Sequence, residues 1–225
     1  LAGPAAPREV GHYDTLGWGY CVALDGRTLY LGNADGLYIL DVADPTHPTL
    51  AGYFETPGRL ERLVVQGGLA LLSSGDYVNY PCRDLRIVDV ADPARPRELA
   101  LYAQQPSGSY PLVPIALEGR YACIVAQGDE LRVLDLADPA HPALVSSYAL
   151  GRLVEVAPAG DARLLAAGGG SLATIDLTDP AQPCELARAA LPSPGTLVAA
   201  EGGLAFTLQG PPAGAASAGD ALLGA

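Results

Sequence analysis

The chain has 225 residues, 49% of them hydrophobic and 17% charged, a composition that excludes a disordered segment and supplies enough apolar surface for a folded core. The net charge of −12, from 25 acidic residues against 13 basic ones that are all Arg, would repel a phosphate backbone or an anionic lipid surface, so we expect no nucleic-acid partner. No apolar run approaches the ~18 residues that cross a bilayer, so we expect no direct membrane insertion.

Taken in chain order, short apolar strands alternate with turns rich in Gly and Pro. After an N-terminal strand at residues 9–13, each unit of the pattern begins with two strands separated by a Gly-containing turn. A third strand follows, with a pattern that ends Asp-x-x-Asp-Pro, and a fourth strand follows a second Pro three residues later. The third-strand pattern occurs at residues 37–45, 85–93, 131–139 and 172–180.

The units recur at a nearly constant spacing. The first prolines of successive copies are 41 to 48 residues apart, counting Pro4 as the start of a copy that is split between the two ends of the chain. Four strands per repeat at a period in the forties is typical of the blades of a β-propeller. The sequence therefore predicts an all-β, five-bladed β-propeller, closed by the N-terminal strand joining the last blade.

We expect one domain over residues 1–225. Its blades are predicted at about residues 20–55, 62–103, 113–149, 153–190, and 196–225 together with 1–13. Residues 211–219 are low in complexity, so completeness of the fifth blade stays open.

The recurring I-V-D-V-x-D-P-x-x-P signature resembles the LVIVD repeat, a family of predicted bacterial and archaeal propellers that are often secreted or surface-anchored. The resemblance covers essentially the whole chain, and only the split copy departs from it, with Gly3 and Ala225 at the two Asp positions. It implies a propeller fold and an extracytoplasmic location, and it implies no particular activity. The chain has no Met and no signal sequence, so we expect a mature or excised segment.

The four cysteines are far apart and form no C-x-x-C pair, so the sequence predicts no metal site and no cofactor. Two disulfides with three connectivities are open, as are free thiols in the core. These residues are Cys21, Cys82, Cys123 and Cys184.

The paired Asp residues of each copy, such as Asp41 and Asp44, could be interpreted as calcium ligands. Calcium takes six to eight oxygen ligands, whereas each turn offers one short carboxylate before its Pro. Asp before Pro commonly starts a turn and caps nearby N–H groups, so we expect these residues to form turns.

A ligand site is expected where the repeats differ, because a rigid scaffold carries its site on variable loops. Two enlarged loops, at residues 74–84 and 104–111, and the segment 14–20 are predicted to emerge on one face. They offer aromatic and polar side chains suited to a protein or carbohydrate ligand. The alternative is that these aromatics only pack down the loops. The candidate ligand-binding residues are Trp18, Tyr20, Arg62, Tyr77, Asn79, Tyr80, Gln105 and Tyr110.

Two carboxylates on predicted inner strands, Glu61 and Glu155, leave a hydrolase of glycans or small esters as the alternative function. Glu155 stands at an apolar repeat position, so it should be partly buried and need a partner, with Arg62 and Arg152 the candidates. No motif for nucleophilic or metal catalysis is present, so a non-catalytic binding or scaffold protein is preferred. A spacer within a larger surface protein is a third interpretation.

Overall fold

The computed structural model describes residues 8–75, 84–103, 115–126, 130–151, 155–191, 195–201, 204–209 and 223–224, and every regular element in these ranges is a β-strand. The chain divides into two compact units, Leu1–Leu99 and Ala100–Ala225, with the boundary inside one strand. The all-β prediction is confirmed for the described part of the chain.

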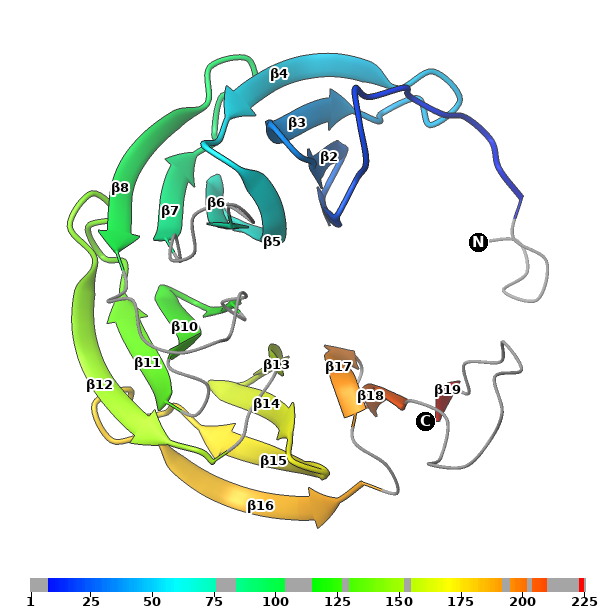
Figure 1. Cartoon of the computed structure of the whole chain (residues 1–225). Coiled ribbons are helices and arrows are strands. Elements are labelled where there is room, and N and C mark those ends of the chain that lie inside the picture. Colours follow the sequence, from blue (N-terminus) through cyan, green and yellow to red (C-terminus); the bar gives the residue numbers. More distant parts are fainter. Residues whose placement is uncertain are drawn as a thin grey trace. The chain divides into compact units, whose positions relative to one another are not determined.

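The first unit contains two four-stranded antiparallel sheets whose strands follow chain order (Figure 1). The first sheet is formed by β1 (Cys21–Asp25), β2 (Thr28–Gly32), β3 (Gly36–Asp41) and β4 (Thr49–Glu55). The second is formed by β5 (Arg59–Gln66), β6 (Leu69–Gly75), β7 (Asp84–Asp89) and β8 (Arg97–Ala103). The innermost strands β1 and β5 are neighbours, so the two sheets pack on each other.

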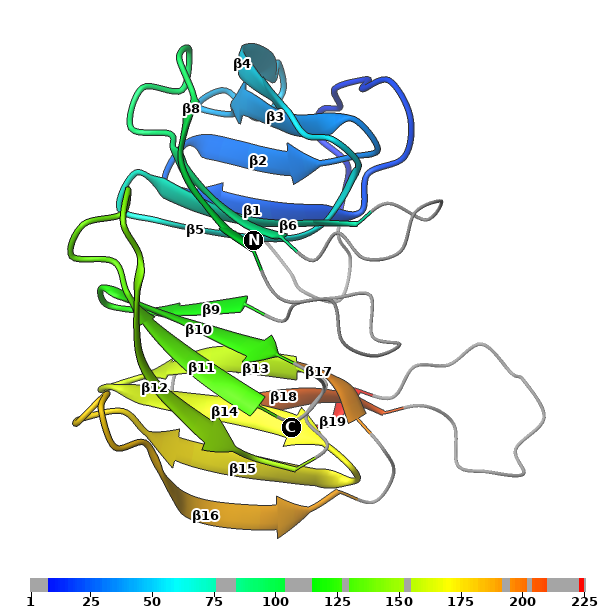
Figure 2. The same ribbon diagram turned by 60° about the vertical axis from the view of Figure 1, so that its left-hand side comes forward.

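The second unit contains three sheets (Figure 2). The third sheet of the chain is formed by β9 (Ile115–Glu118), β10 (Tyr121–Ala126), β11 (Glu130–Asp135) and β12 (Ala143–Ala149). The fourth is formed by β13 (Glu155–Gly160), β14 (Arg163–Gly168), β15 (Ser171–Asp176) and β16 (Cys184–Ala190). The fifth has three strands in the described residues, β17 (Gly195–Glu201), β18 (Leu204–Gln209) and β19 (Leu223–Gly224). The inner strands β9, β13 and β17 are successive neighbours.

The predicted strand at residues 9–13 is not formed in the structure, although these residues are described. A strand exists only through ladder bonds to a partner. Its expected partner is the third strand of the fifth sheet, which is described only at Leu223–Gly224.

Packing between neighbouring sheets explains the apolar third strands. In β3, Leu37 and Ile39 point into the core between the first two sheets, together with Leu72 and Val88 of the second. Leu40, the next residue, is also buried. A third strand that is covered on both faces needs apolar residues at consecutive positions rather than strict alternation. An equivalent core lies between the third and fourth sheets.

The repeated Asp residues form the predicted turns. The Asp41 carboxylate accepts the N–H of Ala43 at 2.9 Å, and the Asp44 carboxylate accepts the N–H of Thr46 at 3.0 Å. The same two bonds recur in the other three complete copies. The Asp44 carbonyl oxygen also accepts the N–H of His47. Turn formation is thereby confirmed as the role of these carboxylates.

Hydrogen bonds to the Asp44 carboxylate at the first of these turns make stability depend on pH. The Thr46 hydroxyl, and after it the His47 ring, donate to the Asp44 carboxylate and lower its pKa from 3.8 to about 2. The ionised Asp44 carboxylate therefore contributes its full stability above the pKa of an Asp side chain in the unfolded chain, about 3.9. This contribution disappears as the pH falls toward 2. We expect Asp44→Asn, which keeps an oxygen for Thr46, to show a smaller drop in Tm between pH 5 and pH 2. Thermal unfolding across that range tests this, with His47→Ala expected to lie in between. Superimposable profiles of wild type and Asp44→Asn would contradict it.

Candidate functional site

The segment leading into β1 is held by Asn33, a buried residue in the turn between β2 and β3. Its side-chain amide donates to the Leu16 carbonyl at 2.7 Å, and its oxygen accepts the N–H groups of Asp35 and Gly36, each at 3.1 Å. The Tyr20 N–H donates to the Gly32 carbonyl at 2.9 Å and extends the pairing of β1 and β2 by one residue. Asn33 thus fixes the course of residues 16–20 over the first sheet.

The side chains that this arrangement leaves outside are large and apolar. Residues 16–20 are all exposed, and on β1 the side chains of Val22 and Leu24 are exposed while those of Cys21 and Ala23 are half-buried, as the period of two along a strand requires. We name this set the β1 row, and it consists of Leu16 (80% exposed), Trp18 (81%), Tyr20 (44%), Val22 (62%) and Leu24 (64%).

An ion pair from β5 lies beside the aromatic end of the β1 row. The Arg59 guanidinium stands over the Tyr20 ring, 4.5 Å from its centroid, and also donates to the Glu61 carboxylate. Both charged side chains are largely buried. A cation on the face of an aromatic ring contributes about 0.5 to 2 kcal/mol, depending on its exposure to water. Tyr20 is therefore fixed in place, and Trp18, two residues before it, is exposed to solvent.

Cys21, which follows Tyr20, is a structural thiol. Burial raises the pKa of its thiol to about 11, and Arg62 acts against this rise. Its Sγ contacts the Leu60 carbonyl oxygen at 3.5 Å. Burial likewise raises the pKa of Cys123 to about 12, so both thiols stay protonated and unreactive at neutral pH. Cys21, Cys123 and Cys184 are free thiols, and Cys82 lies outside the described residues.

Only part of the predicted ligand site is described. Trp18, Tyr20 and Arg62 all belong to the first unit, where Arg62 adds positive charge close to Cys21. The remaining candidates, Tyr77, Asn79, Tyr80, Gln105 and Tyr110, lie outside the described residues. Sequence reasoning missed Arg59. Arg59 and Glu61 are two residues apart on β5, but the register of this strand shifts between Leu60 and Arg62, so regular alternation could not place them together.

The two carboxylates of the hydrolase alternative lie in different units. Glu61 is held by Arg59 in the first unit. Glu155 begins β13 in the second unit, paired with Ala167, and is buried as predicted. Of its two expected partners, Arg152 lies outside the described residues and Arg62 belongs to the first unit. A carboxylate held as an ion pair braces a structure as readily as it serves chemistry.

The described residues contain no group of three His, Cys, Asp or Glu side chains placed to hold a metal ion. The same residues contain no helix with the length and hydropathy needed to span a membrane.

Comparisons with known proteins support the repeat and the fold. The family model described as LVIVD repeat matches residues 20–56, 73–104 and 114–149. No curated protein matches the chain. One similar solved structure is that of a functionally unknown protein from Desulfotomaculum acetoxidans DSM 771, with a TM-score of 0.73 and 13% identity over 91% of this chain and 68% of that chain. Another is BBS1N in complex with ARL6DN, with a TM-score of 0.59 and 11% identity over 81% of this chain and 58% of that chain. At these identities the likeness concerns the fold alone.

Proposed function

We propose that this chain, which carries LVIVD repeats, is a non-catalytic binding module on a closed five-bladed ring, with its ligand surface at the aromatic end of the β1 row. The observation that carries this proposal is the exposure of Trp18 and Tyr20 beside the Arg59–Glu61 pair. Exposed single apolar residues are common, but an exposed Trp two residues from a Tyr whose ring is held by a largely buried ion pair is unusual for a surface that only faces water.

The chemistry of this surface suits a ligand with both an apolar face and hydroxyl groups. Trp18 and Tyr20 offer flat apolar area with a polar tip, on which the C–H face of a sugar ring packs well. The charged groups of Arg59, Glu61 and Arg62 offer donors and acceptors at its edge. We therefore take a saccharide as the first ligand to test and a protein loop as the second, with a secreted or cell-surface location.

Ring closure is supported first by a comparison of equivalent positions in the repeats. Val22 and Leu24 are 62% and 64% exposed on β1. The counterpart of Val22 on β13, Val156, is buried. Val156 packs in the core between the third and fourth sheets, whereas on β1 the residues that pack between the first and second sheets are Cys21 and Ala23. We infer that the last sheet of the chain covers Val22 and Leu24 and leaves Trp18 and Tyr20 at the rim.

A second support comes from contacts between one repeat and the next. Gly52 of β4 lies so close to the Pro93 carbonyl oxygen that a Cβ would overlap it, and the Ser146 hydroxyl of β12 donates to the Pro180 carbonyl at 2.6 Å. Both stand four residues after the second Pro of a copy and meet the first Pro of the following copy. Gly11 occupies that position after Pro7, and a Cβ there would overlap the Pro45 carbonyl oxygen. Residues 9–13 thus lie against the first sheet as an outer strand of a preceding blade would.

Trp18 is the only Trp, so its fluorescence tests the ligand surface directly. We expect strong quenching by acrylamide in the free protein, because the side chain is 81% exposed. Titration with a panel of oligosaccharides should produce a saturable blue shift and protect Trp18 from acrylamide. Tyr20→Ala should weaken that binding by about tenfold or more, since removing a central aromatic costs over 1 kcal/mol.

The control is stability. Tyr20→Ala should leave the Tm nearly unchanged, whereas a large loss of stability would show that Tyr20 is a packing residue. Weak quenching of free Trp18 would mean that the chain itself covers the surface. No response to any saccharide or to a peptide library would remove the proposed function.

A further inference from the structure

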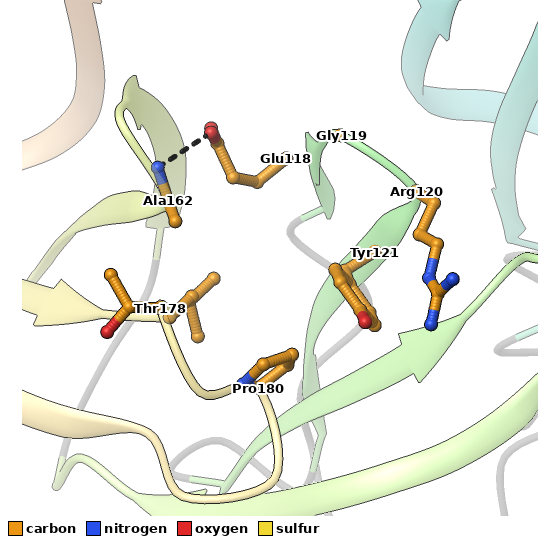
Figure 3. Close-up of a pocket in the computed structure, with 8 residues that line it drawn as sticks. Glu118, Gly119, Arg120, Tyr121, Ala162, Thr178 and Pro180 are labelled. Carbon is orange, nitrogen blue, oxygen red and sulfur yellow. Dashed lines mark hydrogen bonds between the residues drawn. The ribbon is translucent and has the colours of Figure 1, made fainter.

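A separate pocket of about 280 Å³ lies in the second unit, between the third and fourth sheets (Figure 3). The β9–β10 turn supplies Glu118, Arg120 and Tyr121. The fourth sheet supplies Ala162 from its β13–β14 turn and Pro180 from the Asp-Pro turn that follows β15. The pocket thus belongs to one unit and involves none of the residues of the β1 row.

The pocket exists where the fourth repeat departs from the others. Its first hairpin has one residue more than its counterparts, and the register of β13 shifts between Pro158 and Gly160. Asp161 and Ala162 both adopt left-handed backbone angles, with φ of 52° and 55°, although this conformation favours Gly or Asn. The turn presents the Ala162 N–H to the Glu118 carboxylate at 3.1 Å. Two successive strained residues at a cavity suggest a functional constraint rather than a turn chosen for stability.

The charges around the pocket favour a cationic ligand. Arg120 also lines the pocket, but its guanidinium donates to Asp135 at 2.9 Å and stands over the Tyr121 ring at 5.0 Å. In Figure 3, Arg120 lies on one side of Tyr121, and Glu118, Ala162 and Pro180 lie on the other. A carboxylate has about four acceptor positions, so Glu118 has capacity for donors beyond Ala162. The Tyr121 ring, the Ala162 methyl group and the Pro180 ring provide apolar walls beside this carboxylate.

We propose that this pocket binds a primary alkylammonium group, with the ammonium on Glu118 and the alkyl chain against Tyr121 and Pro180. The group is supplied either by a free amine or by a lysine side chain of a partner. An overall charge of −12 raises the local concentration of either cation at the surface. An anionic head would be repelled by Glu118, while the Arg120 guanidinium that lines the pocket is paired with Asp135.

The experiment uses n-pentylammonium as the probe and 1-pentanol as its neutral counterpart, at low ionic strength with a ¹⁵N-labelled protein. We expect saturable shifts of the Ala162 and Gly119 amide signals with the amine and none with the alcohol. Nα-acetyl-lysine amide is titrated in parallel, and tighter binding than that of n-pentylammonium indicates a partner's lysine as the source, while weaker binding indicates a free amine.

Variants complete the test. Glu118→Gln keeps an acceptor for the Ala162 N–H and removes the charge, so it should weaken binding of n-pentylammonium about tenfold, the difference between a charged and a neutral acceptor. Tyr121→Thr, which installs the residue of the equivalent position Thr28, should also weaken it. Asp25→Asn alters the matching carboxylate of the first repeat and should change nothing. Shifts that do not saturate, that occur equally with 1-pentanol, or that survive Glu118→Gln overturn the proposal. These outcomes are independent of saccharide binding at Trp18.

Discussion

Replacing Gly52 by Ala is expected to lower the free energy of unfolding by about 3 kcal/mol, the upper part of the range for overpacking a dense site. A Cβ at this position in β4 would overlap the Pro93 carbonyl oxygen of the following repeat. Both groups are backbone, so no side chain can rotate away, and strand and turn must separate. For a chain of this size the loss corresponds to a drop of roughly 6–12 °C in Tm, which thermal and denaturant unfolding measure.

Gly26→Ala is the matched control for this substitution. Gly26 has a φ of 60°, so Ala is strained there, but nothing lies within 4 Å of the added methyl group. Its cost should stay near about 1 kcal/mol, the usual penalty for Ala in the left-handed region. Equal losses in the free energy of unfolding for the two variants would mean that Gly52 and the Pro93 carbonyl are not closely packed in solution.

The sequence predicted strands and turns well because their signals are local. Pairs such as Asp41 with Asp44 cap the chain two residues further on, and the apolar run around Ile39 shows a strand covered on both faces. The bulge between Pro158 and Gly160 was not predicted, because an extra residue can enter either the turn or the strand. The strand predicted at residues 9–13 is not formed in the structure, and its formation depends on a distant partner rather than on a local signal.

The candidate sites also differ in whether they have a local sequence signal. Trp18 and Tyr20 were found because large aromatics before a strand stand out against the repeat, and the structure leaves both exposed. Arg59 was missed because its role depends on the Tyr20 ring, which comes from a different sheet. The pocket beside Glu118 was also missed, since it arises from the backbone angle of Ala162 rather than from any reactive side chain.

Leu24→Asp tests ring closure, and its expected effect is large for a residue that is 64% exposed on β1. If the last sheet covers Leu24, the substitution removes an apolar contact and places a charge in an interface. We expect a loss of about 2 to 4 kcal/mol in the free energy of unfolding, from the transfer of Leu and the desolvation of Asp. Denaturant unfolding at neutral pH measures it.

The same substitution at Leu50 provides the comparison. Leu50 is 47% exposed on the outer strand β4, a position that no blade covers in a closed ring. Leu50→Asp should therefore change stability by no more than about 0.5 kcal/mol, as for most surface sites. Both are exposed leucines on edge strands of the first sheet, so a difference between them reports a covering surface over β1. Equally small effects would mean that Leu24 faces water, and the ring would then be open at the β1 row.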